Sequence, residues 1–284
     1  MRPYVIADVF TDAPLEGNQV AVFTDGAGLS DELMQRTARE LNLSETVFLL
    51  PAQDGAADAR ARIFTPAAEL PFAGHPVLGT AFVLAEERPG ATSVVRLETG
   101  LGVIQIALTR DGDRVVFGEM DQRVPTFEPF DRPAELLAAL GVERSLLPVE
   151  LYRNGPEFAY VALESEDAVA ALAPDMRALT AFGHLGANCF AVVARGTRVK
   201  TRMFAPGLGV AEDPATGSAA GPLALHLVRH GWSEFGARIE IRQGAEIGRP
   251  SVIHARVEGT ADHITRIAVG GSAVIVARGE YRLQ

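Results

Sequence analysis

A duplicated loop constrains the fold of this 284-residue chain more than any other sequence feature. The stretch Glu212-Asp213-Pro214-Ala215-Thr216-Gly217-Ser218-Ala219 has a degenerate copy in the first half, Gly74-His75-Pro76-Val77-Leu78-Gly79-Thr80-Ala81. Arg62-Ile63-Phe64 precedes the first copy as Arg202-Met203-Phe204 precedes the second. In each copy an apolar strand pattern runs into Gly, Pro and small residues and then into a helical pattern. The duplication predicts two similar halves, each with a strand, a loop and a helix start.

The loop of each half carries an ionisable residue directly before its proline, His75 in the first and Asp213 in the second. The unpaired N–H groups and the positive dipole end of the following helix form a ready anion site, and small residues let a ligand approach the backbone. Structural roles stay open for the same residues. The Gly and Pro residues turn corners in many proteins, His75 suits a helix start, and Asp213 suits a helix N-cap.

The length and the duplication favour two halves, which we place at residues 1–125 and 126–284. Residues 121–131 contain Pro125 and Pro129 and show no periodicity, so they are the predicted linker. A helix is expected over residues 76–86, and the last fifty residues alternate repeatedly, as strands do. The predicted fold class is α+β, with two pseudo-symmetric halves, each a mostly antiparallel sheet curled around a central helix.

The composition excludes several classes of protein. The formal net charge is −10, from 36 acidic and 26 basic residues, and Lys200 is the one lysine, so the clustered cations of a nucleic-acid surface are missing. No apolar run approaches membrane-spanning length, and Asp8 interrupts the apolar N-terminus before a signal-peptide core could form. The single cysteine, Cys189, fits a reducing compartment. We expect a cytoplasmic protein without nucleic-acid or membrane partners.

Glu45 is the candidate general acid/base. It stands in Leu43-Ser44-Glu45-Thr46-Val47-Phe48, a β-prone run that begins polar and becomes apolar. At the start of a strand with apolar neighbours, desolvation disfavours the charged form of a carboxylate. This raises its pKa, as a general acid/base requires. The alternative is an exposed glutamate at a strand end.

Several familiar signatures fail on inspection. Gly100-Leu101-Gly102 lacks the rest of the dinucleotide fingerprint, and no Gly-Lys-Ser/Thr phosphate loop occurs. Thr216 stands where the hydrolase elbow around Ser218 would need a glycine. His226 and His230 have a ligand-capable spacing, but Leu227 replaces the catalytic Glu of the zincin pattern. The chemistry that remains is acid/base catalysis on a small carboxylated substrate, without a metal or a cofactor.

Four motifs, in the same order, resemble the phenazine-biosynthesis isomerase (PhzF-type) family over nearly the whole chain. They are Asp8-Val9-Phe10-Thr11 with Gly17-Asn18, Asn42-Leu43-Ser44-Glu45-Thr46-Val47-Phe48, Gly74-His75-Pro76, and Glu212-Asp213-Pro214-Ala215-Thr216-Gly217-Ser218-Ala219.

The resemblance implies the diaminopimelate-epimerase-like fold, an active site in the cleft between the halves, and a homodimer. It implies cofactor-free isomerisation of trans-2,3-dihydro-3-hydroxyanthranilate, in which a proton leaves one ring carbon and returns to another. By the same resemblance Glu45 is the acid/base, and His75 and Asp213 are its polar partners. Three further residues are implied to bind the substrate carboxylate or hydroxyl: Gly74, Gly217 and Ser218.

Two departures from the family and its relatives bear on the chemistry. Gln19 follows Gly17-Asn18 where family members often have proline. The related epimerases and racemases use one cysteine from each half, but no cysteine lies in either loop here, which disfavours two-thiol racemisation. Two alternatives stay open. One is epimerisation or tautomerisation of another small amino or hydroxy acid, and the other is a non-catalytic carboxylate-binding protein.

Overall fold

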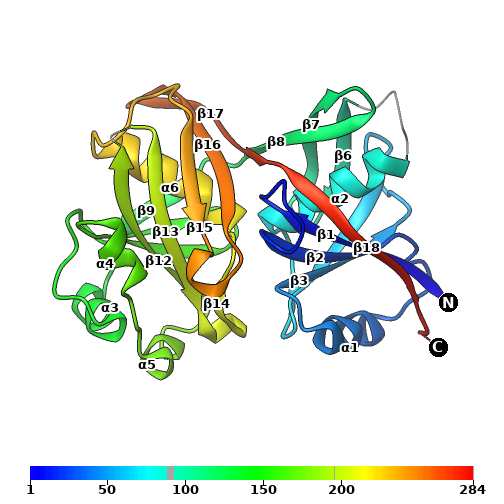
Figure 1. Cartoon of the computed structure of the whole chain (residues 1–284), viewed down its shortest axis with the longest axis horizontal. Coiled ribbons are helices and arrows are strands. Elements are labelled where there is room, and N and C mark those ends of the chain that lie inside the picture. The colour runs from blue at the N-terminus through cyan, green and yellow to red at the C-terminus, as the bar shows by residue number, and fades with distance from the viewer. Residues whose placement is uncertain (88–92, 195, 284) are drawn as a thin grey trace. The chain divides into compact units, whose positions relative to one another are not determined.

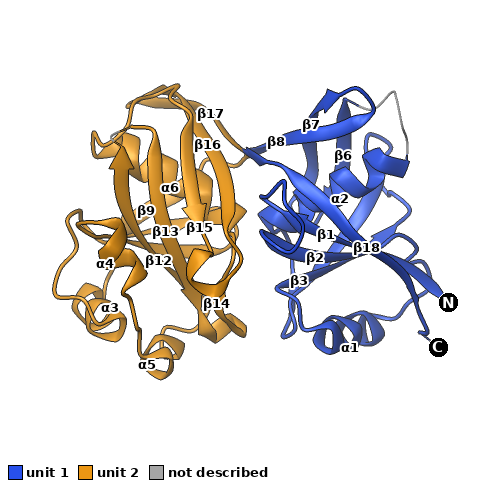
Figure 2. Ribbon diagram, in the orientation of Figure 1, with its two compact units in different colours: residues 1–121, 270–284 blue, residues 122–269 orange. Residues whose placement is uncertain are grey.

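The computed structural model describes residues 1–87, 93–194 and 196–283. These residues form two compact units, residues 1–121 with 270–284 and residues 122–269 (Figure 2). The expected division at 125/126 placed the whole C-terminus in the second half. Residues 270–284 instead belong to the first unit, because the last strand pairs with the first strand of the chain. Both chain termini therefore lie in unit 1 (Figure 1).

Unit 1 contains two helices, α1 (Asp31–Leu41) and α2 (Gly74–Glu87), among the described residues. Its strands are β1 (Arg2–Val9), β2 (Asn18–Phe23), β3 (Glu45–Leu50), β4 (Ala59–Phe64), β5 (Glu69–Leu70), β6 (Val94–Thr99), β7 (Gly102–Asp111), most of β8 (Arg114–Gln122), and β18 (Ala273–Tyr281). Antiparallel pairs join β18 to β1, β1 to β2, β3 to β4, β6 to β7, and β7 to β8. Two pairs are parallel, β2 with β3 and β4 with β6.

The described residues of unit 2 form a central helix, α6 (Gly217–Arg229), and three short ones, α3 (Pro133–Leu140), α4 (Glu166–Ala170) and α5 (Met176–Thr180). Its strands are β9 (Thr126–Pro129), β10 (Glu150–Arg153), β11 (Glu157–Ala162), β12 (Leu185–Ala194), β13 (Arg198–Ala205), β14 (Val210–Asp213), β15 (Ile239–Gln243), β16 (Ser251–Thr260) and β17 (His263–Gly271). Short 3-10 turns cover Pro206–Leu208 and Ala245–Ile247.

The pairing pattern repeats between the units, as the duplicated loop predicts. In unit 2 the pairs β11 with β12 and β13 with β15 are parallel, whereas β9 with β10, β10 with β11, β12 with β13, β13 with β14, and β15 with β16 are antiparallel. The central helix follows β5 in unit 1 and β14 in unit 2, and it precedes the strand that pairs in parallel. This repetition confirms the α+β class with two related halves.

Each central helix is enclosed by its own unit. Residues 74–85 of α2 and 217–228 of α6 are all buried, which suits sequences that are apolar or small on every side. At Gly79 the helix α2 approaches the sheet so closely that a Cβ atom would lie 2.7 Å from Val9 and from Val20. None of the helices in the described ranges is long and apolar enough to cross a membrane.

The repeated arginines form matching forks. Arg62 on β4 donates from Nε and Nη2 to Glu69 on β5, over 2.8 and 2.7 Å. Arg202 on β13 donates in the same way to Glu212 on β14, again over 2.8 and 2.7 Å. In both units the fork ties a long strand to the short strand before the central helix, and bidentate geometry makes such a tie specific.

The predicted linker at residues 121–131 contains the boundary between the units, at 121/122, but it is not free of regular structure. Residues 126–129 form β9, which pairs antiparallel with β10 from Thr126 opposite Arg153 to Pro129 opposite Glu150. Proline is tolerated here because β9 is short and Pro129 is its last residue. Periodicity could not reveal this strand, since all four of its residues are exposed.

Candidate active site

Glu45 and His75 meet in unit 1. Glu45 is the first residue of β3, opposite Val20 in the parallel pair with β2. His75 is the second residue of α2, which begins two residues before the predicted start. The Nδ1 atom of His75 lies 3.3 Å from Oε2 of Glu45, and their side chains are 4% and 15% exposed. An exposed glutamate at a strand end is therefore ruled out.

The second ring nitrogen of His75 determines what the first can do. Its Nε2 atom lies 3.1 Å from the main-chain oxygen of Gln19. A carbonyl oxygen only accepts, so Nε2 carries the hydrogen and Nδ1 of the neutral ring presents its lone pair to Glu45. Burial lowers the pKa of His75 to about 3, although the Gln19 carbonyl opposes this, so the ring is neutral at pH 7. The contact becomes a hydrogen bond when Glu45 holds a proton.

Gly17 fixes the segment that brings the Gln19 carbonyl to His75. Its φ of 68° lies in the left-handed region, and a Cβ there would lie 2.4 Å from the Val9 carbonyl oxygen. Gln19 acts through its main chain, which a proline would also supply. The departure from the family's Gly-Asn-Pro therefore leaves the contact with His75 intact.

Asp213 is held by a separate network in unit 2. Its Oδ2 atom accepts a 2.7 Å hydrogen bond from the Thr216 hydroxyl. Gln243, at the end of β15, donates from Nε2 to the Asp213 carbonyl and to the Thr216 hydroxyl, over 2.7 and 2.9 Å. Thr216, and not Asp213, occupies the N-cap position of α6. The alternative role of Asp213 as a helix N-cap is therefore excluded.

The two copies of the loop differ in how they enter their helices. Both central helices begin at a glycine, Gly74 in α2 and Gly217 in α6, so His75 and Ser218 are each the second helical residue. His75 and Asp213 therefore do not occupy equivalent positions. His75 and Pro76 lie in the first turn of α2, whereas Asp213 and Pro214 lie before the start of α6. A proline is tolerated in either place, and the sequence repeat could not separate them.

The structure thus brings together Glu45, His75 and Gly74 in unit 1, and Asp213, Gly217 and Ser218 in unit 2. That all six face one substrate stays a prediction. Sequence reasoning missed Gln19 and Gln243. Gln19 contributes a main-chain atom that carries no side-chain signal, and Gln243 lies 30 residues from Asp213 at an ordinary strand end.

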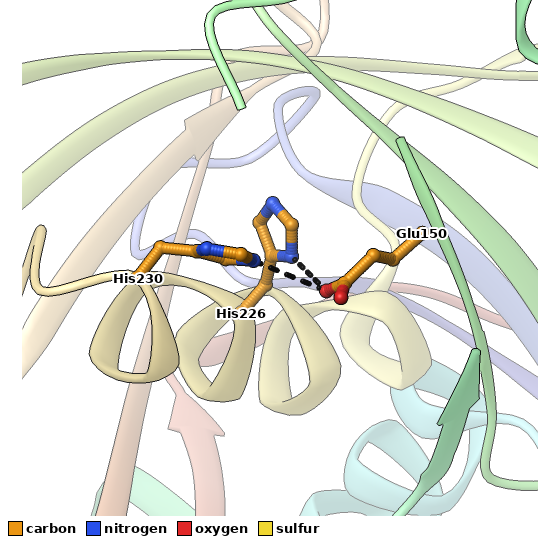
Figure 3. A group of neighbouring side chains, drawn as sticks. All are labelled: Glu150, His226 and His230. Carbon is orange, nitrogen blue, oxygen red and sulfur yellow. Dashed lines mark hydrogen bonds and ion pairs between the residues drawn. The ribbon is translucent and has the colours of Figure 1, made fainter. Parts of the chain in front are cut away.

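A second polar cluster lies at the other end of α6 (Figure 3). Nδ1 of His226 and Nε2 of His230 each lie 3.2 Å from Oε2 of Glu150 on β10. These three ligand-type atoms lie within 4.8 Å of one another, a grouping that could hold a metal ion. The guanidinium of Arg229, however, already donates to the same Oε2 over 2.6 Å.

The charge of Glu150 is therefore balanced within the chain. Desolvation would raise the pKa of Glu150, but hydrogen bonds from His226, Arg229, His230 and Tyr152 outweigh it and hold the pKa well below its usual range. Burial lowers the pKa of His226, which lies between the rings of Tyr160, Tyr152 and Phe190. We interpret the cluster as an ionic anchor for the end of α6.

Cys189 has no part in proton transfer at neutral pH. It lies on β12 in the apolar core of unit 2. Burial raises the pKa of its thiol to about 12, so the thiolate needed for thiol acid/base chemistry is absent at pH 7.

Comparisons with known proteins agree with these features. A family model described as phenazine biosynthesis-like protein (PhzC-PhzF) matches residues 7–279. The chain is 54% identical over 280 residues to the trans-2,3-dihydro-3-hydroxyanthranilate isomerase of Pseudomonas aeruginosa, covering 98% of this chain and 99% of that protein. It is 53% identical to the protein of the same name from Pseudomonas chlororaphis, with the same coverage.

Solved structures show the same architecture. A PhzF-family protein from Bacillus anthracis gives a TM-score of 0.86 at 25% identity, covering 99% of both chains. A probable proline racemase from Agrobacterium radiobacter gives 0.71 at 15% identity, covering 100% of this chain and 94% of that one, a likeness of fold alone. The fold is therefore epimerase-like, and this chain is an isomerase that belongs to the phenazine biosynthesis-like (PhzC-PhzF) family.

Proposed function

We propose that this chain is a cofactor-independent isomerase of trans-2,3-dihydro-3-hydroxyanthranilate, with Glu45 as the group that moves the proton. The substrate is taken from the names of relatives 52 to 54% identical over 98% of the chain. The observation that carries the mechanism is the 3.3 Å contact between Glu45 and a His75 ring whose Nδ1 is an acceptor.

The proton balance in this proposal is internal. The Glu45 carboxylate takes a proton from one ring carbon of the substrate and becomes a carboxylic acid, and it then returns the proton to another ring carbon. Nδ1 of His75 stabilises the protonated acid between these steps, because a hydrogen bond to the neutral form favours that form. By favouring protonated Glu45, His75 lowers the free energy needed to take the proton from the substrate carbon.

In this mechanism, other polar groups bind the substrate without transferring a proton. The main-chain N–H groups at the starts of α2 and α6, at Gly74, Gly217 and Ser218, bind the substrate carboxylate, since the first N–H groups of a helix have no acceptor within it. Asp213 accepts a hydrogen bond from the substrate hydroxyl or amine. A cytoplasmic homodimer remains the expected setting.

The test is solvent-deuterium incorporation from D₂O, followed by NMR on trans-2,3-dihydro-3-hydroxyanthranilate. We expect rearrangement by the wild type and its loss, by a factor of about 10³ or more, in Glu45→Gln. Glu157→Gln is the matched control, because Glu157 is likewise a partly buried first residue of a strand. Rearrangement of the substrate by Glu45→Gln would refute Glu45 as the base. The rearrangement itself decides this outcome, because direct return of the abstracted proton would leave little deuterium in the product.

The same assay separates the alternatives. An inactive wild type with this substrate, combined with deuterium exchange into another small amino or hydroxy acid, would move the activity to a different isomerisation. Binding of such acids without any exchange would indicate a carboxylate-binding protein.

A further inference from the structure

A proline interrupts the central helix of unit 2 one turn after Ser218. Pro222 has no N–H, so the Ser218 carbonyl, four residues earlier, lacks its helical donor. The corresponding helix α2 has no such gap, because Gly79 stands four residues after His75 and has an N–H. The gap therefore belongs to the half whose helix begins with Gly217-Ser218.

Asn154 fills this gap. It lies in the turn between β10 and β11, is 6% exposed, and donates from Nδ2 to the Ser218 carbonyl over 2.9 Å. The amide orientation follows from its surroundings, since the Ser218 oxygen and Gln122 Oε1, 2.9 and 3.5 Å away, are both acceptors. A buried amide in this place supplies the hydrogen bond that the proline removes.

Neighbouring carbonyls of the same turn are held from the side as well. Gln122 donates from Nε2 to the Gly217 carbonyl over 2.9 Å, and the Tyr160 hydroxyl donates to the Ala219 carbonyl over 2.7 Å. In a trans peptide the N–H points away from the carbonyl. Fixing the carbonyls of Gly217 and Ser218 therefore fixes the direction of the Ser218 and Ala219 N–H groups and of the Ser218 side chain between them.

We propose that Asn154 is a positioning residue for substrate binding, which replaces the missing Pro222 donor and so orients the first turn of α6 at Ser218. This rests on the proposed role of Gly217 and Ser218 in binding the substrate carboxylate. Asn154 acts through the helix and does not itself take part in proton transfer.

The test is a rescue experiment with the full-length chain. Asn154→Ala leaves the Ser218 carbonyl buried without its donor, and we expect KM for trans-2,3-dihydro-3-hydroxyanthranilate to rise about tenfold while kcat stays within about twofold. In the double variant Asn154→Ala/Pro222→Ala, the new N–H of residue 222 donates to the Ser218 carbonyl, and KM should return to near the wild-type value.

Tyr160→Phe is the matched control. It removes a side-chain donor to the next carbonyl, but the N–H of Leu223 is still available to Ala219 in the helix, so KM should hardly change. A double variant that keeps the raised KM of Asn154→Ala would overturn the proposal. So would a fall in thermal stability in Asn154→Ala with KM unchanged, because that result describes a structural role alone.

Two further measurements distinguish this proposal from the function on which it rests. Ser218→Ala, measured beside the others, tests whether Ser218 binds substrate. If the wild type does not turn over this substrate, the amide NMR signals of Gly217, Ser218 and Ala219 decide the positioning claim. They should shift in Asn154→Ala and return in the double variant, and signals that stay in place in Asn154→Ala would refute it.

Discussion

His75 is a single residue whose burial should be visible in the stability of the whole chain. Its pKa is lowered to about 3, while an unfolded histidine titrates near 6.5. Between these values the unfolded state binds more protons than the folded state, so stability rises with pH through this window. The contribution is complete above pH 6.5, is lost progressively toward pH 3, and amounts to about 5 kcal/mol.

We therefore expect His75→Gln, which keeps an amide donor for the Gln19 carbonyl, to flatten the dependence of unfolding free energy on pH. Urea unfolding at pH 7 and pH 4 measures this directly. The same substitution at the exposed His184 is the matched control. Parallel slopes for His75→Gln and the wild type would show that the histidine is not held neutral.

Some residues of the candidate site could be predicted from the sequence, and others could not. Glu45 and His75 were predictable because each is an ionisable residue at the end of a recognisable element. The acceptor state of Nδ1 was not, since it depends on a main-chain carbonyl that any residue at position 19 would present. The proposed role of Asn154 was equally hidden from sequence reasoning, because it depends on Pro222, which lies far along the chain.

Among the secondary-structure elements, the two arginine forks each tie a strand to the short strand before a central helix, but they differ in how deeply their side chains are buried. The side chains of Arg202 and Glu212 are 9% and 8% exposed, while those of Arg62 and Glu69 are 16% and 43% exposed. Removing one partner of a buried pair leaves an uncompensated charge, whereas an exposed partner is replaced by water.

Glu212→Ala should therefore destabilise the protein by about 3 kcal/mol, and Glu69→Ala by about 1 kcal/mol or less. Urea midpoints for the two variants provide the comparison, and each serves as the control of the other. Equal losses would mean that burial does not set the strength of these forks.

The C-terminal end of α6 gives a second prediction for an element. Glu150→Gln keeps the size of the side chain but removes the charge that faces Arg229 and the two histidines. We expect a loss of about 2 kcal/mol in unfolding free energy at pH 7. Glu157→Gln, which affects only the more exposed pair with Arg153, should cost less than about 1 kcal/mol. A neutral result for Glu150→Gln would contradict its role as an anchor.

At the scale of the whole molecule, the duplication was predictable and the division of the chain was not. Repeated motifs indicate two halves, but local periodicity carries no information about which distant strand completes a sheet. Tyr281 lies opposite Arg2 and Ala273 opposite Val9, so β18 covers the whole length of β1. Tyr281 also packs edge-on against Phe23 in a small apolar cluster of unit 1.

Fragments of the chain test this arrangement. Residues 122–269 are contiguous and should fold alone, whereas residues 1–121 without β18 should not. A rearranged chain that places residues 270–284 directly before Met1 should restore cooperative unfolding to unit 1, because Tyr281 lies opposite Arg2 and a short turn can join them. Circular dichroism during heating measures all three. Cooperative melting of residues 1–121 alone would refute the requirement for β18.

The return of residues 270–284 to the first strand has a consequence for how the protein is made. A ribosome adds roughly 5 to 20 residues per second, so the 148 residues from 122 to 269 separate the two parts of unit 1 by roughly 7 to 30 s. Unit 2 can therefore fold before the ribosome has made β18, the last strand of unit 1. Glu45 and His75 lie in unit 1, so translation that stops before residue 270 would leave the proposed proton-transfer pair in an unfinished unit.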